Sequence, residues 1–240
     1  MKDRLPETTI DGRPLALAEL AATADDHKQV VRWLWTVLLA DGTRALTSAG
    51  RWQEALHRVE QHKGIGSRLL DGRQVAVLAC LDAGHPDQAL HTLATTQPAE
   101  PWEEDVASCL TVLCLAQNRQ PTEAATKQMI HRYLSGHVGP GLAVFRSRWG
   151  LTVMDLATNS GIENIVQRLV KDAATDADGY AAHELLQHPK AEQIFTVEAR
   201  NDLLATAVAA GLRTEPAPQG LTEDLIASTA RALQVTSCFI

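Results

Sequence analysis

The sequence predicts an all-α protein, and three observations support this prediction. Ala and Leu carry most of the apolar content of the 240 residues, and both enter helices at little cost. Aromatic residues, which favour strands, make up only 4% of the chain. Apolar side chains recur at helical spacing between Gly and Pro residues that end helices. With 45% hydrophobic and 21% charged residues, the composition is that of a globular protein with one large domain or two small ones.

The chain is expected to open with a lead-in and a first helix. Residues 1–13 offer few apolar anchors and are expected to be a flexible lead-in. Residues 14–24 are predicted to form a helix with Pro14 at its first position, where the missing N–H costs nothing.

The next predicted helix begins at two carboxylates. Asp25 and Asp26 suit a helix N-terminus, and residues 30–40 behind them are apolar on nearly every side. A helix of this kind is expected to be central. Trp33 and Trp35 lie about 200° apart around it, so we expect them to pack on opposite sides, or one of them to line a groove.

An internal repeat is the clearest signal in the sequence. Residues 49–57, AGRWQEALH, recur as AGHPDQALH in residues 83–91, an offset of 34 residues. Such a pattern indicates a helical hairpin: Gly ends the first helix in a left-handed conformation, and a small Ala lets the second helix approach closely. The apolar face of one hairpin needs the next hairpin to cover it.

A Gly followed five residues later by Ala, with a period of 34, resembles the tetratricopeptide (TPR) repeat family. Pro101 falls where that family often closes a repeat, and the resemblance covers about residues 30–135. The family's Trp-Leu-Gly start is missing, and a third copy at residues 116–124 lacks the Gly and carries two extra residues. The resemblance implies a TPR-like α-hairpin stack (an α-solenoid); a plain α-hairpin bundle that reuses Gly–Ala packing is the alternative.

Further helices are expected behind the repeats, forming a C-terminal helical bundle. Glycines and a proline at residues 136–141 indicate a boundary, so we expect a repeat region over 14–138 and a C-terminal region over 139–240. A Pro-rich stretch at 213–220 reads as a stiff linker, from which the last helix could dock away from its sequence neighbours. The expected helices run over residues 100–115, 121–134, 142–158, 162–174, 178–187, 197–210 and 222–235.

The charge balance argues against nucleic acid as a partner. A formal charge of −7 and a pI near 5.7 do not suit a protein that replaces counterions along phosphates. The compact basic-aromatic cluster Arg146-Ser147-Arg148-Trp149 is interpreted as a solvated helix face beside one buried Trp.

The termini and cysteines favour a cytoplasmic protein, in a bacterial-type cytosol. The start lacks the apolar stretch of a signal peptide, and no run is long enough to span a membrane, so no membrane partner is expected. Four cysteines form no CxxC pair, and three lie in apolar helical patterns, so we expect reduced, mostly buried thiols. Cys238 has only two residues behind it, which is one too few for prenylation.

No motif in the sequence identifies a reaction. The histidine pairs are five or six residues apart, whereas zinc ligands on one helix face are three or four apart, so neither a metal nor a cofactor is expected. Asp176-Ala177-Asp178-Gly179 begins like a calcium loop but lacks the later oxygen ligands, and a turn before a helix is expected instead. No nucleophile elbow is present, so we lean against an enzyme.

The TPR resemblance implies a concave groove made by the first helices of the hairpins, and hence an adaptor that binds a protein or peptide. The alternative is a small all-α enzyme or ligand-sensing protein with a pocket between the repeats and the C-terminal helices, and a homodimer is compatible with either. Arg44 is expected to clamp a carboxylate or a backbone carbonyl, Gln74 to pair with an extended peptide, and Asp71 and Asp82 to meet basic residues. The groove positions are Val37, Ala40, Arg44, Thr47 and Ser48 in the first repeat, and Asp71, Gln74, Leu78, Leu81 and Asp82 in the second.

Overall fold

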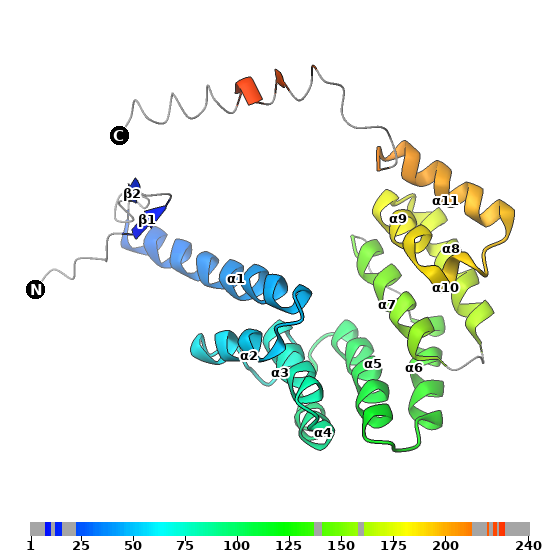
Figure 1. The fold of residues 1–240 in the computed structure, drawn as a ribbon, viewed down its shortest axis with the longest axis horizontal. Coiled ribbons are helices and arrows are strands. Elements are labelled where there is room, and N and C mark those ends of the chain that lie inside the picture. The colour runs from blue at the N-terminus through cyan, green and yellow to red at the C-terminus, as the bar shows by residue number, and fades with distance from the viewer. Residues whose placement is uncertain are drawn as a thin grey trace, which may run out of the picture. The chain divides into compact units, whose positions relative to one another are not determined.

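The computed structural model describes residues 8–10, 13–15, 23–136, 141–157, 161–212, 220, 223–224 and 226–228. Helices account for nearly all of the regular structure, which confirms the all-α class (Figure 1). The chain forms two compact units, residues 1–127 and 128–240, and the division falls inside α6 (Glu123–Ser135). The boundary expected from the sequence lies just after that helix.

A short β-hairpin precedes the helices. β1 (Thr8–Ile10) and β2 (Arg13–Leu15) pair in antiparallel fashion, with Thr9 opposite Pro14. The prediction of a helix over residues 14–24 is therefore wrong at its start, because Pro14 belongs to a strand. Proline is tolerated there because both strands of a two-stranded sheet are edges.

The hairpin also corrects the expectation of a flexible lead-in for residues 8–10 and 13, whereas the rest of residues 1–13 lies outside the described residues. The missed signal is Asp11-Gly12, because Asp-Gly between two short extended runs is typical of a two-residue hairpin turn. Residues 16–22, the rest of the predicted first helix, lie outside the described residues.

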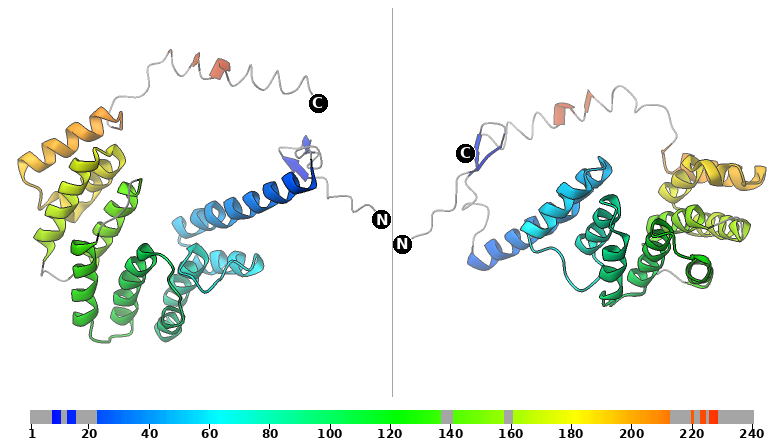
Figure 2. Two further views of the ribbon diagram at one scale, coloured as in Figure 1. Left: turned by 180° about the vertical axis from the view of Figure 1, so that it is seen from behind. Right: turned by 60° about the horizontal axis from the view of Figure 1, so that its bottom comes forward.

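Two helical hairpins follow one another in the first unit. α1 (Ala24–Ser48) packs against α2 (Trp52–Gln61), and α3 (Asp71–Asp82) packs against α4 (Pro86–Ala94). α2 also contacts α3, and α4 contacts α5 (Pro101–Gln117). α3 contacts both α1 and α5, so the first helices of the hairpins are neighbours, as the two further views in Figure 2 also show.

The two copies of the repeated motif have the same backbone geometry. Gly50 (φ +71°) and Gly84 (φ +76°) both adopt the predicted left-handed conformation. In both, the N–H after the glycine bonds back to a carbonyl of the helix that ends there, as in a Schellman motif. A Cβ at either glycine would meet no atom, so the backbone angle, not space, favours glycine. Ala55 and Ala89 in the second helices are fully buried, as the repeat predicts.

The third copy of the motif keeps this geometry with different residues. α5 ends with the same two hydrogen bonds, but Arg119 (φ +53°) takes the left-handed position. The N–H of Thr126 makes the first bond of α6, to the carbonyl of Thr122 at 2.8 Å, and Thr126 is buried. Thr126 therefore corresponds to the buried alanines, whereas Ala124, which the sequence matched to them, is exposed.

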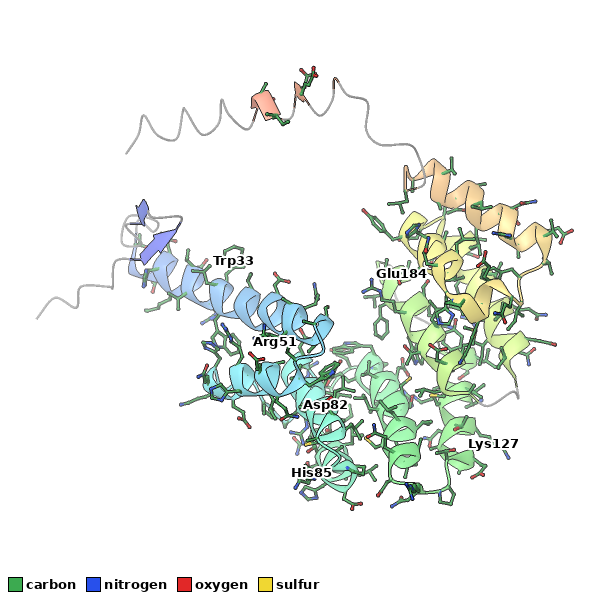
Figure 3. The ribbon with its side chains drawn as sticks, viewed as in Figure 1. Trp33, Arg51, Asp82, His85, Lys127 and Glu184 are labelled. Atoms are coloured by element: carbon green, nitrogen blue, oxygen red, sulfur yellow. The ribbon has the colours of Figure 1, made fainter. Side chains whose placement is uncertain are left out.

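α1 is not the central helix that its composition predicts. Its N-terminal cap is Thr23, and the predicted acidic pair lies in its first turn. However, Trp33 is 63% exposed and Trp35 is 44% exposed, and Val31 and Leu34 are exposed as well. Figure 3 shows Trp33 on the side of α1 that faces away from α2. α1 has 25 residues and α2 only 10, about 37 Å against 15 Å, so α2 covers only part of α1.

The core of the first unit is made of small and medium apolar side chains contributed by α2 to α5 and the loop before α3. Cys114 and Cys109 are buried and Cys80 is half-buried, and all three are free thiols, which confirms the predicted burial. Burial raises the pKa of the Cys114 thiol to about 11. Cys238 lies outside the described residues. The two core clusters contain Leu69, Val77, Leu81, Ala89, Leu110 and Cys114, and Ala55, Val59 and Val75.

A buried carboxylate ties the start of α5 to the loop before α3. Glu103 is fully buried and pairs with the guanidinium of Arg68, which comes from that loop. It also accepts the backbone N–H groups of Leu69 at 2.9 Å, Ala99 at 3.3 Å and Glu100 at 3.2 Å. The hydrogen bond from Arg68 is the main reason that the pKa of Glu103 lies below its usual value.

The second unit contains the predicted C-terminal helices. α7 (Ala143–Leu156) contacts α8 (Ile162–Asp176) and α9 (Gly179–Gln187), and α11 (Val197–Ala209) packs on α8 and α9. A short helix, α10 (Pro189–Glu192), follows α9 and has Pro189 at its first position. The observed bounds of α7, α8, α9 and α11 lie within about two residues of the predicted ones, and side chains of Asp178 and Thr196 cap the starts of α9 and α11.

Two further predictions concern the turn before α9 and the last helix of the chain. Asp178 caps α9 by accepting the N–H of Ala181 at 2.9 Å, which confirms the turn expected in place of a calcium loop. Of the predicted last helix, 222–235, the described residues 223–224 and 226–228 are helical, and the others lie outside the described residues.

Arg146 is buried rather than solvated. Its Nε donates to Asp172 at 2.9 Å, and its Nη2 donates to the carbonyl of Tyr133 at 2.8 Å. The guanidinium lies 4.5 Å from the ring centre of Tyr133 and 5.2 Å from that of Trp149. The interpretation of residues 146–149 as a solvated face is therefore wrong for Arg146 and Ser147, which are both buried, although Trp149 is buried as predicted.

A second arginine joins this cluster from α8. Arg168 donates to Asp172 at 2.8 Å, and also to the carbonyls of Leu134 at 2.9 Å and Gly136 at 3.3 Å. Together the two arginines satisfy carbonyls at the end of α6 that have no partner within that helix.

Candidate functional site

Side chains from α1, α2 and α3 line one small hollow in the first unit, which we call the α1–α3 pocket. Its volume is about 180 Å³, which is below the roughly 300–1,000 Å³ typical of small-molecule sites. A hollow of this size suits a side chain of a partner better than a cofactor. The lining residues are Thr43, Arg44, Thr47, Trp52, Asp71, Gln74, Val75 and Leu78.

Helical spacing explains why these side chains meet. Asp71, Gln74, Val75 and Leu78 stand at positions i, i+3, i+4 and i+7 of α3, which form one helix face. The α1 residues Thr43, Arg44 and Thr47 are spaced in the same way. Trp52, the first residue of α2, closes the pocket from the second helix of the hairpin.

Four of the six polar and charged groove positions, which are the predicted partner-binding residues, line this pocket: Arg44, Thr47, Asp71 and Gln74. Ser48 and Asp82 do not line it; both are exposed and stand at the last positions of α1 and α3. Figure 3 labels Asp82 near the end of α3. The pocket therefore occupies only the middle of the groove implied by the TPR resemblance.

The apolar groove positions implied by the TPR resemblance do not all line this pocket. Leu78 lines the pocket, whereas Leu81 is buried in the core and its prediction as a groove residue is wrong. Leu81 lies four residues after Val77 on α3, so the two share the helix face that packs in the core. Val37 is half-buried and does not line the pocket, and the side chain of Ala40 lies outside the described residues.

Sequence reasoning missed three lining residues: Thr43, Trp52 and Val75. Trp52 belongs to the repeated motif itself, at the position where the second copy has Pro86, and this difference between the copies was the available signal. Thr43 and Val75 are buried and form the floor, so only the packing of α1 on α3 reveals them.

The two charges of the α1–α3 pocket are opposite in sign and come from different helices. Arg44 lies 3.5 Å from Asp41, but the two side chains are 72% and 64% exposed, so this pair is weak and leaves the guanidinium available. Asp71 is exposed at the first position of α3, where the positive end of the helix dipole favours a carboxylate.

The polar side chains between these charges have local roles. The Nε2 of Gln74 donates to the carbonyl of Leu69 at 2.9 Å, so part of this amide holds the preceding loop. An amide has a second N–H and a carbonyl oxygen, which keep capacity for an extended peptide. Thr47 donates to the carbonyl of Arg44 at 3.1 Å.

The described residues contain neither a cluster of metal-ligating side chains nor a membrane-spanning helix. Within them, no three His, Cys, Asp or Glu side chains gather closely enough to hold one ion. None of the helices in the described ranges combines the length and hydrophobicity needed to cross a bilayer.

Comparison with known proteins returned no relative. No protein-family model, no curated protein and no solved structure matches the chain.

Proposed function

We propose that this protein is a TPR-like helical-repeat adaptor that binds a protein or peptide partner at the α1–α3 pocket. One observation carries the proposal: the first helices of two successive hairpins and the Trp that starts α2 line a single hollow. A surface shared by adjacent hairpins is what a repeat protein offers to an elongated partner.

The chemistry of the α1–α3 pocket favours an extended peptide with charges of both signs. Arg44 suits a carboxylate or a peptide carbonyl, and Asp71 suits a Lys or Arg of the partner. Trp52, Leu78 and Val75 form apolar walls for one side chain between these charges. An aromatic wall beside a charged clamp is the usual composition of an energetic centre in an interface.

The alternative of a small enzyme or ligand sensor finds less support in this pocket. The eight lining residues include one carboxylate and two threonines but no His, Cys or Ser, so the usual pairing of a Ser or Cys nucleophile with a His base is missing from this pocket. Free thiols at the three described cysteines support the placement of the adaptor in a reducing, cytoplasmic compartment.

The test is a peptide-binding experiment. Twelve-residue peptides selected from a random library on the immobilised protein are labelled, and their affinities for the wild type and single variants are measured by fluorescence anisotropy. Arg44→Glu and Asp71→Lys are each expected to weaken binding about tenfold or more, since each places a like charge against the peptide. Trp52→Ala is expected to weaken it to a similar extent.

Two matched controls separate the pocket from general charge effects. Arg58→Glu makes the same charge change at an exposed site on α2, and Asp202→Lys makes it at an exposed site on α11, outside the predicted groove positions. Both are expected to leave affinities within about twofold of the wild type. Peptides that bind all three pocket variants as tightly as the wild type, or a library that yields no binder, would exclude this function.

A further inference from the structure

The outer side of α1 is apolar, although α1 is the first helix of the hairpin stack. In repeat proteins each unit covers the apolar face of its neighbour, and a terminal unit needs a polar outer face. α1 packs on α2 and α3, and Thr43 is buried on the side that lines the α1–α3 pocket. Leu34 lies nine residues before Thr43, about 180° from it around the helix. The side of α1 centred on Leu34 therefore points away from α2 and α3.

This side of α1, which we call the α1 seam, has an apolar centre and one polar side chain at each end. Its side chains point within about 60° of the direction of Leu34, at 100° per residue. Leu34 itself is 44% exposed, and the seam is flanked by Val31 on one edge and Trp33 on the other, which are 50% and 63% exposed. The seam consists of His27, Val30, Leu34, Val37 and Asp41.

The α1 seam is complementary to a second copy of itself in the antiparallel direction. His27 and Asp41 lie seven residues before and after Leu34, and both point within about 20° of its direction. When two copies of α1 pair antiparallel with Leu34 at the centre, His27 of each copy lies level with Asp41 of the other. In the parallel direction Asp41 would face Asp41, and this contact between like charges disfavours that arrangement.

A second pair of opposite charges lies along one edge of the α1 seam. Asp26 and Arg44 each lie about 80° from Leu34, on the edge that carries Trp33. A two-fold axis places the same edges of two antiparallel helices side by side, and positions 26 and 44 are then offset by two residues, about 3 Å along the axis. The hydroxyl of Thr23 donates to one carboxylate oxygen of Asp26 at 2.7 Å, and a carboxylate has a second oxygen to offer a guanidinium. Both charge pairs have their midpoint at residues 34–35, inside the apolar stretch.

We propose that two copies of this chain associate through the α1 seam, antiparallel, with a two-fold axis at Leu34. The contact covers Val30, Leu34 and Val37 at its centre, and the two charge pairs on each side of the axis fix its direction and register. The paired region, residues 26–44, is about 27 Å long. α2 and α3 lie on the opposite side of each α1, so they do not separate the two helices. Such a dimer carries two α1–α3 pockets and can hold two peptide segments of one partner.

The test is sedimentation equilibrium of the full chain at concentrations up to about 100 µM. The wild type is expected to reach twice the monomer mass of 26.0 kDa as its concentration rises. Leu34→Asp is expected to raise the dimer dissociation constant at least about a hundredfold, because two carboxylates then face each other at the axis. Circular dichroism checks that this variant keeps its helices, as expected for a side chain that points away from α2 and α3.

A charge exchange tests the direction of pairing. His27→Glu places a carboxylate against Asp41 of the other copy and is expected to raise the dissociation constant about tenfold. The double variant His27→Glu/Asp41→Lys forms this pair again with charges of opposite sign. It is expected to return the constant to within about threefold of the wild type. In a parallel dimer the double variant would face Glu with Glu and Lys with Lys, so recovery identifies the antiparallel arrangement.

Val208→Asp on α11 is the matched control, because Val208 is an apolar side chain of similar exposure, 50%, outside the α1 seam. It is expected to leave the dissociation constant unchanged. A wild type that stays monomeric at about 100 µM, a dimer that survives Leu34→Asp, or a double variant no better than His27→Glu would overturn the proposal. The variants at 27, 34 and 41 leave the lining of the α1–α3 pocket intact. Peptide affinity is therefore measured separately on Leu34→Asp, and either proposal can fail alone.

Discussion

Each unit places a charged side chain at a helix end whose backbone groups need hydrogen-bond partners. The first unit has a carboxylate at the start of α5, and the second has two guanidinium groups at the end of α6. In the first unit, the buried carboxylate of Glu103 in the first turn of α5 accepts the N–H of the N-cap residue, Glu100, and that of Ala99 before it. In the second unit, the end of α6 leaves carbonyl acceptors, and Arg146 and Arg168 donate to three of them. In each case a partner of opposite charge, Arg68 or Asp172, accompanies the capping charge.

The difference between a carboxylate at one helix end and guanidinium groups at the other follows from the helix dipole. A helix N-terminus carries partial positive charge and its C-terminus partial negative charge, so a carboxylate suits the first and a guanidinium the second. A buried charge is costly unless it is paired and hydrogen-bonded, and both sites provide pairing. These groups therefore belong to the architecture, and their removal should destabilise the unit that contains them.

The largest effect is expected from Arg146→Met. This change leaves the carbonyl of Tyr133 without its donor and Asp172 with one fewer partner, so the free energy of unfolding should fall by about 3 kcal/mol. Urea denaturation followed by circular dichroism measures it. Arg148→Met is the control, since Arg148 stands two residues away on α7 but is 66% exposed in its pair with Glu184. A loss below about 0.5 kcal/mol is expected there; equal losses for both variants would show that burial of Arg146 contributes nothing.

A smaller loss is expected from Glu103→Gln, about 2 kcal/mol at pH 7, because the amide offers one acceptor to donors that now share two charged oxygens. The pKa of Glu103 is lowered in the folded state, so its contribution is complete above the unfolded pKa, near 4.5. As the pH falls below that value, the contribution is lost. The difference in unfolding free energy between wild type and variant should therefore be constant from pH 7 to 5 and shrink towards pH 3.

Glu104→Gln provides the comparison for that titration, because Glu104 is an exposed neighbour in the same first turn. Its stability difference from the wild type is expected to be smaller at pH 7. A Glu103→Gln difference that grows on acidification would contradict the assigned direction of the pKa.

The smallest effects concern the third way of ending a helix, the left-handed residue. Arg119→Gly should stabilise the protein by about 0.5–1 kcal/mol, because glycine adopts a positive φ without the steric cost borne by Arg119. Gly84→Ala should destabilise it by about 1 kcal/mol for the converse reason. Thermal unfolding followed by circular dichroism compares both with the wild type, and a shift of the same sign for the two variants would refute the backbone explanation.

Features that depend on local chemistry were predictable from the sequence. Gly50 and Gly84 end helices as expected because a left-handed position favours glycine whatever surrounds it. The start of α5 was also predictable, because a proline at the first position and acidic residues in the first turn favour a helix N-terminus whatever surrounds them. The β-hairpin was equally local, and Asp11-Gly12 should have predicted it.

Features that depend on contacts with residues distant in the sequence were not predictable. The exposure of Trp33 follows from the short length of α2, and the burial of Arg146 follows from carbonyls on α6 and a carboxylate on α8. Neither partner is visible in the sequence around those residues. In the candidate site, the TPR resemblance pointed to Arg44 and Asp71, but the buried Thr43 and Val75 became evident only once α1 was packed on α3.

The exposed length of α1 has a thermodynamic consequence. Water ordered around Trp33, Val31 and Leu34 is released whenever another apolar surface covers them, at roughly 25 cal/mol per Å² covered. Association along this helix would gain its free energy largely from solvent entropy near room temperature. It would also lower the heat capacity of the system, which calorimetry detects independently of any charge on the partner.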